Sequence, residues 1–334
     1  MADIPIISVV VPAYDAAATL GSTLASILDQ SHAALEVLVV DDGSTDATAA
    51  IIERAAASDH RVVPVSYGEN RGRSFARNEG MRRATGEWVA MVDADDLLAR
   101  DRFERFVAAI GRFTDTRLLT DDRLGWRLDA TGGVVVEHRF PGRHTWRVGE
   151  PHRLDPSRHF TDRFGHLDLV VHRDFLEATG AQYPEDMSTA EDLTFYNTLL
   201  FWPEDPRPVR VASGSYYYRL APTSRTAGGR EARVLMAQRV VDATGSSDLA
   251  ELQRRWGPTH AYLSGRAERQ LEAEGRLRPK PAALDGIETP TENSLTGSAA
   301  LVGIKGLQWL SRWVDRHDRP AVAADIARQL SRSV

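Results

Sequence analysis

Apolar positions in the first hundred residues form short continuous runs that alternate with segments of helical spacing. The runs lie at 6–12, 35–40, 61–66 and 87–92, and the helical segments at 19–30, 47–57 and 74–84. A continuous apolar run is typical of a strand buried on both faces of a parallel sheet. The alternation therefore predicts right-handed βαβ units and an α/β fold, with a mostly parallel sheet flanked by helices.

Beyond residue 95 the pattern predicts further helices and short strands. One helix is expected over 97–110, and another from a cap at Ser188 or Thr189 to Trp202. The acidic pair Asp121-Asp122 is most simply a loop. The expected strands lie at 118–120, 132–136 and 215–219.

After about residue 228 the chain changes to helical segments and a linker. The helices are expected at 230–244, 248–256, 259–275, 299–315 and 320–330. Pro and Gly mark a linker near 279–298. The helix at 299–315 has an apolar face with two Trp, which suits docking, a homodimer or peripheral membrane contact. We therefore predict one domain over 1–228 and a helical C-terminal extension over 229–334.

The composition narrows the class of protein. At 334 residues and 42% hydrophobic, the chain can bury a large core. A net charge of −6 with scattered arginines argues against a nucleic-acid partner. The absence of Cys excludes disulfides and suits the cytoplasm. We expect neither a secretory leader nor a spanning helix, because no basic segment opens the chain and its apolar runs are short.

Three of the predicted strands end in residues that suit a nucleotide. They lead into Pro12-Ala13-Tyr14, Asp41-Asp42 and Asp93-Ala94-Asp95-Asp96. Open α/β sheets bind ligands at the carboxyl ends of their strands. Three close carboxylates repel one another unless a cation neutralises them, and Mg²⁺ or Mn²⁺ prefers such oxygens. The alternative is that these acids cap the next helix. Neither a Gly-rich dinucleotide motif nor a P-loop is present.

These motifs, with others farther along, resemble those of a known family. They are Ser8-Val9-Val10-Val11-Pro12-Ala13-Tyr14, Val39-Val40-Asp41-Asp42-Gly43-Ser44-Thr45-Asp46, Asn70-Arg71-Gly72, Ala76-Arg77-Asn78, Gly86-Glu87-Trp88, Ala190-Glu191-Asp192 and Ser215-Tyr216-Tyr217-Tyr218-Arg219. Over roughly residues 5–225 the chain resembles inverting family-two glycosyltransferases. The resemblance implies a GT-A fold, with a donor half over about 1–110 and an acceptor half over about 111–228.

The resemblance also implies roles on the donor side. Pro12, Ala13 and Tyr14 would line the base pocket, with the Tyr14 ring available for stacking. Asp42 would accept a hydrogen bond from a uracil-like base, which favours a UDP-sugar. The rest of the nucleotide would be bound by Arg71 or Arg73, Asn78, Asp93, Ala94 and Arg219.

Two carboxylates would carry the chemistry that the resemblance implies. Asp95 would bind Mn²⁺ or Mg²⁺, which stabilises the leaving diphosphate. Asp192 would be the general base, with Glu191 beside it. The alternative is that Glu191 and Asp192 only stabilise the start of a helix. Many relatives have a His after the Tyr-Arg strand, whereas this chain has none there, so Arg219 or Arg225 would pair with the phosphates instead.

The sequence thus predicts an inverting, metal-dependent glycosyltransferase of surface or exopolysaccharide biosynthesis. Its acceptor would be a glycan or lipid-linked glycan, bound in part by the His-, Arg- and aromatic-rich region 139–164. It would act in the cytoplasm or peripherally at the inner face of the membrane. One alternative is an enzyme of the same fold that transfers or hydrolyses a nucleotide phosphate. Another is a non-catalytic sugar-nucleotide-binding or scaffolding subunit of a polysaccharide assembly complex.

Overall fold

The computed structural model describes residues 4–137, 150–154, 168–204, 206–211, 214–220, 236, 239–240, 242–244 and 319–332. The strands are β1 (Ile7–Ala13), β2 (Leu35–Asp41), β3 (Val62–Ser66), β4 (Trp88–Met91), β5 (Leu97–Leu98), β6 (Leu118–Thr120), β7 (Arg123–Leu128), β8 (Val134–Glu137), β9 (His152–Arg153), β10 (Val170–His172), β11 (Val209–Arg210) and β12 (Tyr216–Arg219). The helices are α1 (Leu20–Leu28), α2 (Thr48–Ser58), α3 (Arg73–Arg83), α4 (Arg102–Arg112), α6 (Arg173–Thr179) and α7 (Glu191–Leu200), and a further helix covers 319–330.

An eight-stranded sheet forms the centre of the molecule, in the order β3-β2-β1-β4-β10-β6-β11-β9. Strands β1 to β4 are parallel to their neighbours in this group. Strand β10 is antiparallel to both β4 and β6, β11 is parallel to β6, and β9 is antiparallel to β11. All of its strands except β10 and β9 therefore point the same way, so the predicted mostly parallel sheet is confirmed.

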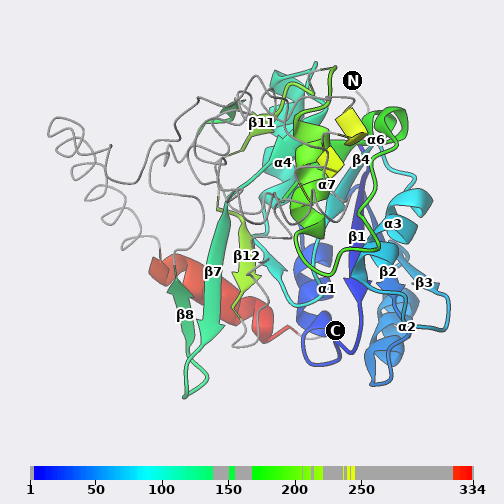
Figure 1. Ribbon diagram of the computed structural model, residues 1–334. Helices are drawn as coiled ribbons and strands as arrows, with labels where there is room; N and C mark the ends of the chain where they lie inside the picture. The colour runs from blue at the N-terminus through cyan, green and yellow to red at the C-terminus, as the bar shows by residue number, and fades with distance from the viewer. Residues whose placement is uncertain are drawn as a thin grey trace, which may run out of the picture.

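Helices cover both faces of this sheet (Figure 1). On one face, Val9 and Val11 of β1 join a buried cluster with residues of α1, α2 and α4. On the other face, Val10 joins a cluster with Ala76 of α3 and Leu199 of α7. Successive residues of a strand point to opposite faces. A strand between two helical layers is therefore apolar at every position, which explains the continuous runs in the sequence.

A smaller sheet, in the order β5-β12-β7-β8, is covered by the helix at 319–330, drawn in red in Figure 1. Ile326 of that helix is fully buried, in a cluster with Leu97 of β5, Trp126 of β7 and Tyr217 of β12. The Tyr217 hydroxyl also donates to the Asp325 carboxylate at 3.1 Å. The helix at 319–330 thus packs on the small sheet. Strand β5 of that sheet directly follows the acidic residues Asp93, Asp95 and Asp96.

Most predicted elements of the first hundred residues agree with the structure to within two positions. The predicted helix at 97–110 is wrong at its start, because Leu97 and Leu98 pair with Tyr217 and Tyr216 as β5 and the helix begins at Arg102. The predicted cap at Ser188 or Thr189 is also wrong. Helix α7 begins instead after Ala190, whose φ of 62° turns the chain without a side-chain cap.

The C-terminal extension is described only in part. The helix expected at 320–330 is confirmed, and the described positions of the segment 230–244 are helical. The helices expected at 248–256, 259–275 and 299–315, and the linker, lie outside the described residues. In the part of the chain that is described, no helix is both long and apolar enough to cross a membrane.

Candidate active site

A cleft of about 940 Å³ opens where β1, β2 and β4 end. Folding brings all the predicted site residues to it except Arg71 and Asn78. Those that line the cleft come from three strand ends, from the start of α7 and from the end of β12. They are Pro12, Ala13, Tyr14, Asp42, Asp93, Ala94, Asp95, Glu191, Asp192 and Arg219.

Tyr14 and Asp42 lie at the ends of β1 and β2. The Tyr14 side chain is 49% exposed, so its ring is free to stack on a planar ligand. The buried Asp42 carboxylate accepts from the Tyr67 hydroxyl at 2.7 Å and from the backbone N–H groups of Arg71 at 2.8 Å and Gly72 at 2.9 Å. A carboxylate offers about four acceptor positions, so Asp42 keeps one for a ligand N–H.

The side chain of Arg71 does not line the cleft. Its guanidinium carbon lies 3.5 Å from the centre of the Phe75 ring, and only its backbone reaches Asp42. The prediction that Arg71 faces the donor therefore gains no support from the lining of the cleft and stays a prediction. The arginine of this segment that lines the cleft is Arg73, the other alternative in the sequence.

Asn78 is likewise engaged elsewhere. Its Nδ2 donates to the Tyr183 carbonyl at 2.9 Å and to the Glu185 carboxylate at 3.1 Å, and its Oδ1 accepts from the Tyr183 N–H at 2.9 Å. All three bonds hold the chain that follows α6 against α3. The prediction that Asn78 contacts the nucleotide stays a prediction, and the contacts of its side chain favour a structural role.

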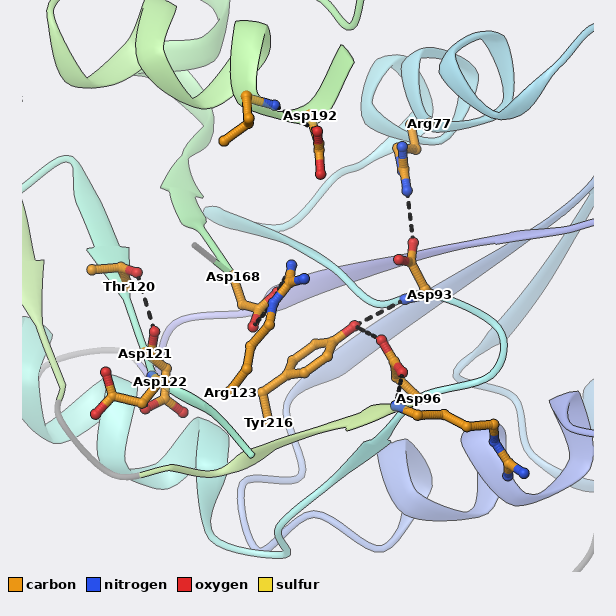
Figure 2. A network of polar contacts seen from close by, with 12 residues as sticks. Arg77, Asp93, Asp96, Thr120, Asp121, Asp122, Arg123, Asp168, Asp192 and Tyr216 are labelled. Carbon is orange, nitrogen blue, oxygen red and sulfur yellow. Dashed lines mark hydrogen bonds and ion pairs between the residues drawn. The ribbon is translucent and has the colours of Figure 1, made fainter. Parts of the chain in front are cut away.

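The acidic loop, residues 93–96, follows β4 and forms one wall of the cleft (Figure 2). Asp93 pairs with Arg77 at 2.8 Å. Although burial opposes ionisation, this guanidinium holds the pKa of Asp93 below its usual range. The fully buried Asp96 carboxylate accepts from the Tyr216 hydroxyl at 2.7 Å and from a backbone N–H of β12, also at 2.7 Å. Two of the three carboxylates are thus engaged by the protein.

Asp95 is the third carboxylate of the acidic loop. It makes no hydrogen bond or ion pair with another residue in the described part of the chain. Burial, and then the charge of Asp93, raise the pKa of Asp95 to about 6. A bound divalent cation would favour its charged form. Among the described residues, no group of three or more His, Cys, Asp or Glu could hold a metal ion.

Glu191 and Asp192 line the cleft from the start of α7. Glu191 is buried, and one of its carboxylate oxygens lies 3.2 Å from Arg73 and 3.3 Å from Arg77. Asp192 is only partly buried, and Figure 2 shows its side chain pointing from α7 toward Arg123 and the acidic loop. The two acids therefore differ: Glu191 holds arginines, whereas Asp192 faces the cleft.

Arg77 links the two walls, because it binds both Asp93 and Glu191. Arg77 stands in the motif Ala76-Arg77-Asn78, but no role was predicted for it. Residues four apart share one face of a helix, so Arg73 and Arg77 lie together on α3. Two arginines on one helix face, next to strand ends rich in carboxylates, are the signal in the sequence that could have identified Arg73 and Arg77 as partners of the acidic residues.

A network of buried ion pairs adjoins the cleft, and Figure 2 shows its members Arg123 and Asp168. The prediction that Asp121-Asp122 is a loop is confirmed, but both side chains are almost fully buried. Their partners are arginines from distant elements, which the local sequence does not reveal. The pairs are Arg102–Asp121 at 3.7 Å, Arg210–Asp122 at 2.9 Å and Arg123–Asp168 at 2.7 Å.

The fold has counterparts among solved structures. S. aureus TarS 1-349 in complex with UDP-GlcNAc has a TM-score of 0.61 and 20% identity, over 81% of this chain and 78% of that one. The same protein with UDP has a TM-score of 0.58 and 20% identity, over 80% and 72%. At this identity the likeness concerns the fold alone, which is the GT-A fold of glycosyltransferases.

Sequence comparison identifies the family. Residues 8–119 match the model of glycosyl transferase family 2. TuaG of Bacillus subtilis, named for teichuronic acid biosynthesis, is 41% identical over 197 residues, which are 59% of this chain and 72% of the relative. The succinoglycan biosynthesis protein ExoO of Rhizobium meliloti is 30% identical over 300 residues, 88% of this chain and 80% of the relative. The chain belongs to glycosyltransferase family 2.

Proposed function

We propose that the protein is an inverting, metal-dependent glycosyltransferase that moves a sugar from a nucleoside diphosphate to a hydroxyl of a glycan or lipid-linked glycan. The observation that carries this proposal is that Asp95 and Asp192 line one cleft from two different walls. A single displacement needs a base for the attacking hydroxyl and a stabilised leaving group on the other side of the sugar. One carboxylate on each wall, one for each task, supports inversion without an enzyme nucleophile.

The features at the end of β1 and β2 support a uridine nucleotide. The exposed Tyr14 ring suits stacking on a base, and the open acceptor position of Asp42 suits the ring N–H of uracil. The volume of the cleft lies within the range of small-ligand sites, roughly 300–1,000 Å³. TarS, which shares the fold, was crystallised with UDP and with UDP-GlcNAc, and this agrees with a UDP-sugar donor.

The acidic loop suits Mn²⁺ or Mg²⁺. The Asp95 carboxylate makes no hydrogen bond or ion pair with another described residue, Asp93 lies beside it, and hard cations accept one or two carboxylates plus substrate phosphates. When bound there, the metal would offset the charge that develops on the leaving diphosphate. Arg219 lines the same end of the cleft, where its guanidinium would pair with phosphate oxygens in place of the missing His.

Asp192 would accept the proton of the attacking hydroxyl. Glu191 would not react, since its carboxylate is held by Arg73 and Arg77. TuaG and ExoO are named for the biosynthesis of two polysaccharides, which supports a glycan or lipid-linked acceptor in a polysaccharide pathway. Of the region 139–164 expected to bind the acceptor, only 150–154 is described, and His152 lies in β9 rather than in the cleft.

The test has two stages. Calorimetric titration with UDP, GDP and their sugars, with and without Mn²⁺, should show metal-dependent binding of the uridine series. The bound donor is then offered to a panel of glycan acceptors, and the anomeric configuration of the product is read by NMR. An inverted product supports the proposal, whereas a retained configuration overturns the single displacement. Tight binding with no transfer to any acceptor, with Asp192 intact, would favour a non-catalytic sugar-nucleotide-binding subunit.

A further inference from the structure

Tyr216 of β12 is buried directly beneath the acidic loop, with 1% of its surface exposed. Its hydroxyl donates to the Asp96 carboxylate at 2.7 Å and accepts from the Asp93 backbone N–H at 3.2 Å. One hydroxyl thus bonds the first and the last residue of the loop (Figure 2). No sequence motif assigned this residue a role of its own.

The ring of Tyr216 is fixed from below. The guanidinium carbons of Arg102 and Arg123 lie 5.4 Å and 5.3 Å from its centre. These arginines belong to the buried ion-pair network, in which Arg123 binds Asp168 at 2.7 and 2.8 Å. A guanidinium attracts the face of an aromatic ring. The network therefore holds the ring rigidly, and the ring delivers its hydroxyl to the loop in one position.

A second set of bonds from β12 fixes the middle of the acidic loop. The backbone N–H of Arg219 donates to the other Asp96 oxygen at 2.7 Å, and its Nε donates to the Asp95 carbonyl at 2.9 Å. The Asp95 carboxylate itself has no such bond to another described residue. The direction of the Asp95 carboxylate is therefore set by the loop backbone on either side of it. Tyr216 and Arg219 hold that backbone through the bonds given above.

From this arrangement we propose that Tyr216 is a positioning residue, which sets the backbone of the acidic loop so that Asp95 presents its carboxylate to the metal. The proposal rests on the metal-binding role of Asp95 in the proposed function. Tyr216 does not touch the donor. It acts through the loop, as groups behind a metal ligand do, and loss of such a group typically weakens metal binding by roughly 10–100-fold.

The test compares two adjacent tyrosines. Tyr216→Phe removes one hydroxyl and keeps the ring between its arginines. Tyr217→Phe is the matched control, because its buried hydroxyl also bonds a carboxylate, that of Asp325, but on the side of the helix at 319–330. Mn²⁺ affinity is measured by calorimetry at saturating UDP. We expect Tyr216→Phe to weaken it roughly 10–100-fold and Tyr217→Phe to leave it unchanged.

Two results would overturn the proposal: wild-type Mn²⁺ affinity in Tyr216→Phe, or an equal loss in Tyr217→Phe, which would indicate general loosening of β12. A second readout needs no ligand. Amide hydrogen exchange over residues 88–98, followed by mass spectrometry, should be faster in Tyr216→Phe than in the wild type, because the Asp93 N–H loses its acceptor.

The exchange measurement also separates the two proposals. If the wild type binds no Mn²⁺ with any nucleotide, the proposed metal-dependent function fails. If the loop then exchanges faster in Tyr216→Phe but not in Tyr217→Phe, this result would still establish that Tyr216 holds the loop. Unchanged exchange would refute the positioning role whatever the metal result.

Discussion

Neutralising the neighbouring acids Glu191 and Asp192 should have different effects: loss of the Glu191 charge should lower stability, and loss of the Asp192 charge should lower the rate of transfer. Glu191→Gln keeps the side-chain volume and removes the charge that Arg73 and Arg77 share. Hydrogen bonds to charged groups contribute roughly 1.5–3 kcal/mol. Arg77 keeps Asp93 as a partner, and Arg73 is half exposed, so water can replace part of what it loses. The expected loss of stability is therefore about 2 kcal/mol, or about 3 °C in Tm for a chain of 334 residues.

Asp192→Asn should instead leave Tm within about 1 °C, because its carboxylate is only partly buried at the edge of the cleft. It should lower kcat roughly 10²–10⁴-fold, the usual contribution of a general base. Differential scanning calorimetry gives Tm, and initial rates at saturating donor give kcat. The assignment is refuted if Glu191→Gln abolishes turnover at unchanged Tm, or if Asp192→Asn keeps the wild-type kcat.

Further predictions concern the metal, the back of the cleft and the C-terminal helix. Asp95→Ala should abolish the Mn²⁺-dependent part of UDP binding in calorimetry, and wild-type affinity would remove Asp95 from the metal site. Because burial and Asp93 raise the pKa of Asp95 to about 6, the carboxylate is charged above that pH and a proton competes with the metal below it. The apparent Mn²⁺ dissociation constant should therefore rise about tenfold per pH unit below about 6, whereas a constant value would contradict this site. Asn78→Ala should cost about 1–3 kcal/mol in urea unfolding, through its lost bonds to Tyr183, and leave UDP affinity unchanged; weaker UDP binding would support Asn78 as a donor contact. Ile326→Asp puts a charge into a fully buried position and should cost about 3 kcal/mol or more in the same assay, unless the helix at 319–330 does not dock in solution.

The parallel strands and the strand-end residues could be predicted because their signals are local. A run such as Val9-Val10-Val11 reports burial on two faces, and the residues that follow it must lie at the ligand-binding edge. The positions of Tyr14, Asp42 and Asp95 in the cleft follow from this rule alone.

What the sequence could not predict depends on partners far along the chain. The loop residues Asp121 and Asp122 are buried because they pair with Arg102 and Arg210, and the local sequence does not reveal these partners. The same holds for Asn78, whose amide resembles a ligand contact in the sequence but is saturated by a segment about a hundred residues later. Helix propensity likewise failed at Leu97, where pairing with a strand more than a hundred residues away outweighed the local helical pattern.

The order in which the small sheet is completed has a consequence for synthesis. The end of β12 at Arg219 and the start of the helix at 319 are 100 positions apart (319 − 219). At about 5–20 residues per second, a ribosome needs about 5–20 s to make that interval. During this time Trp126 and Tyr217 lack the side chain of Ile326 that later covers them. The contact that Ile326 makes with these aromatic side chains is therefore absent until the helix emerges, and apolar surface exposed during synthesis promotes aggregation.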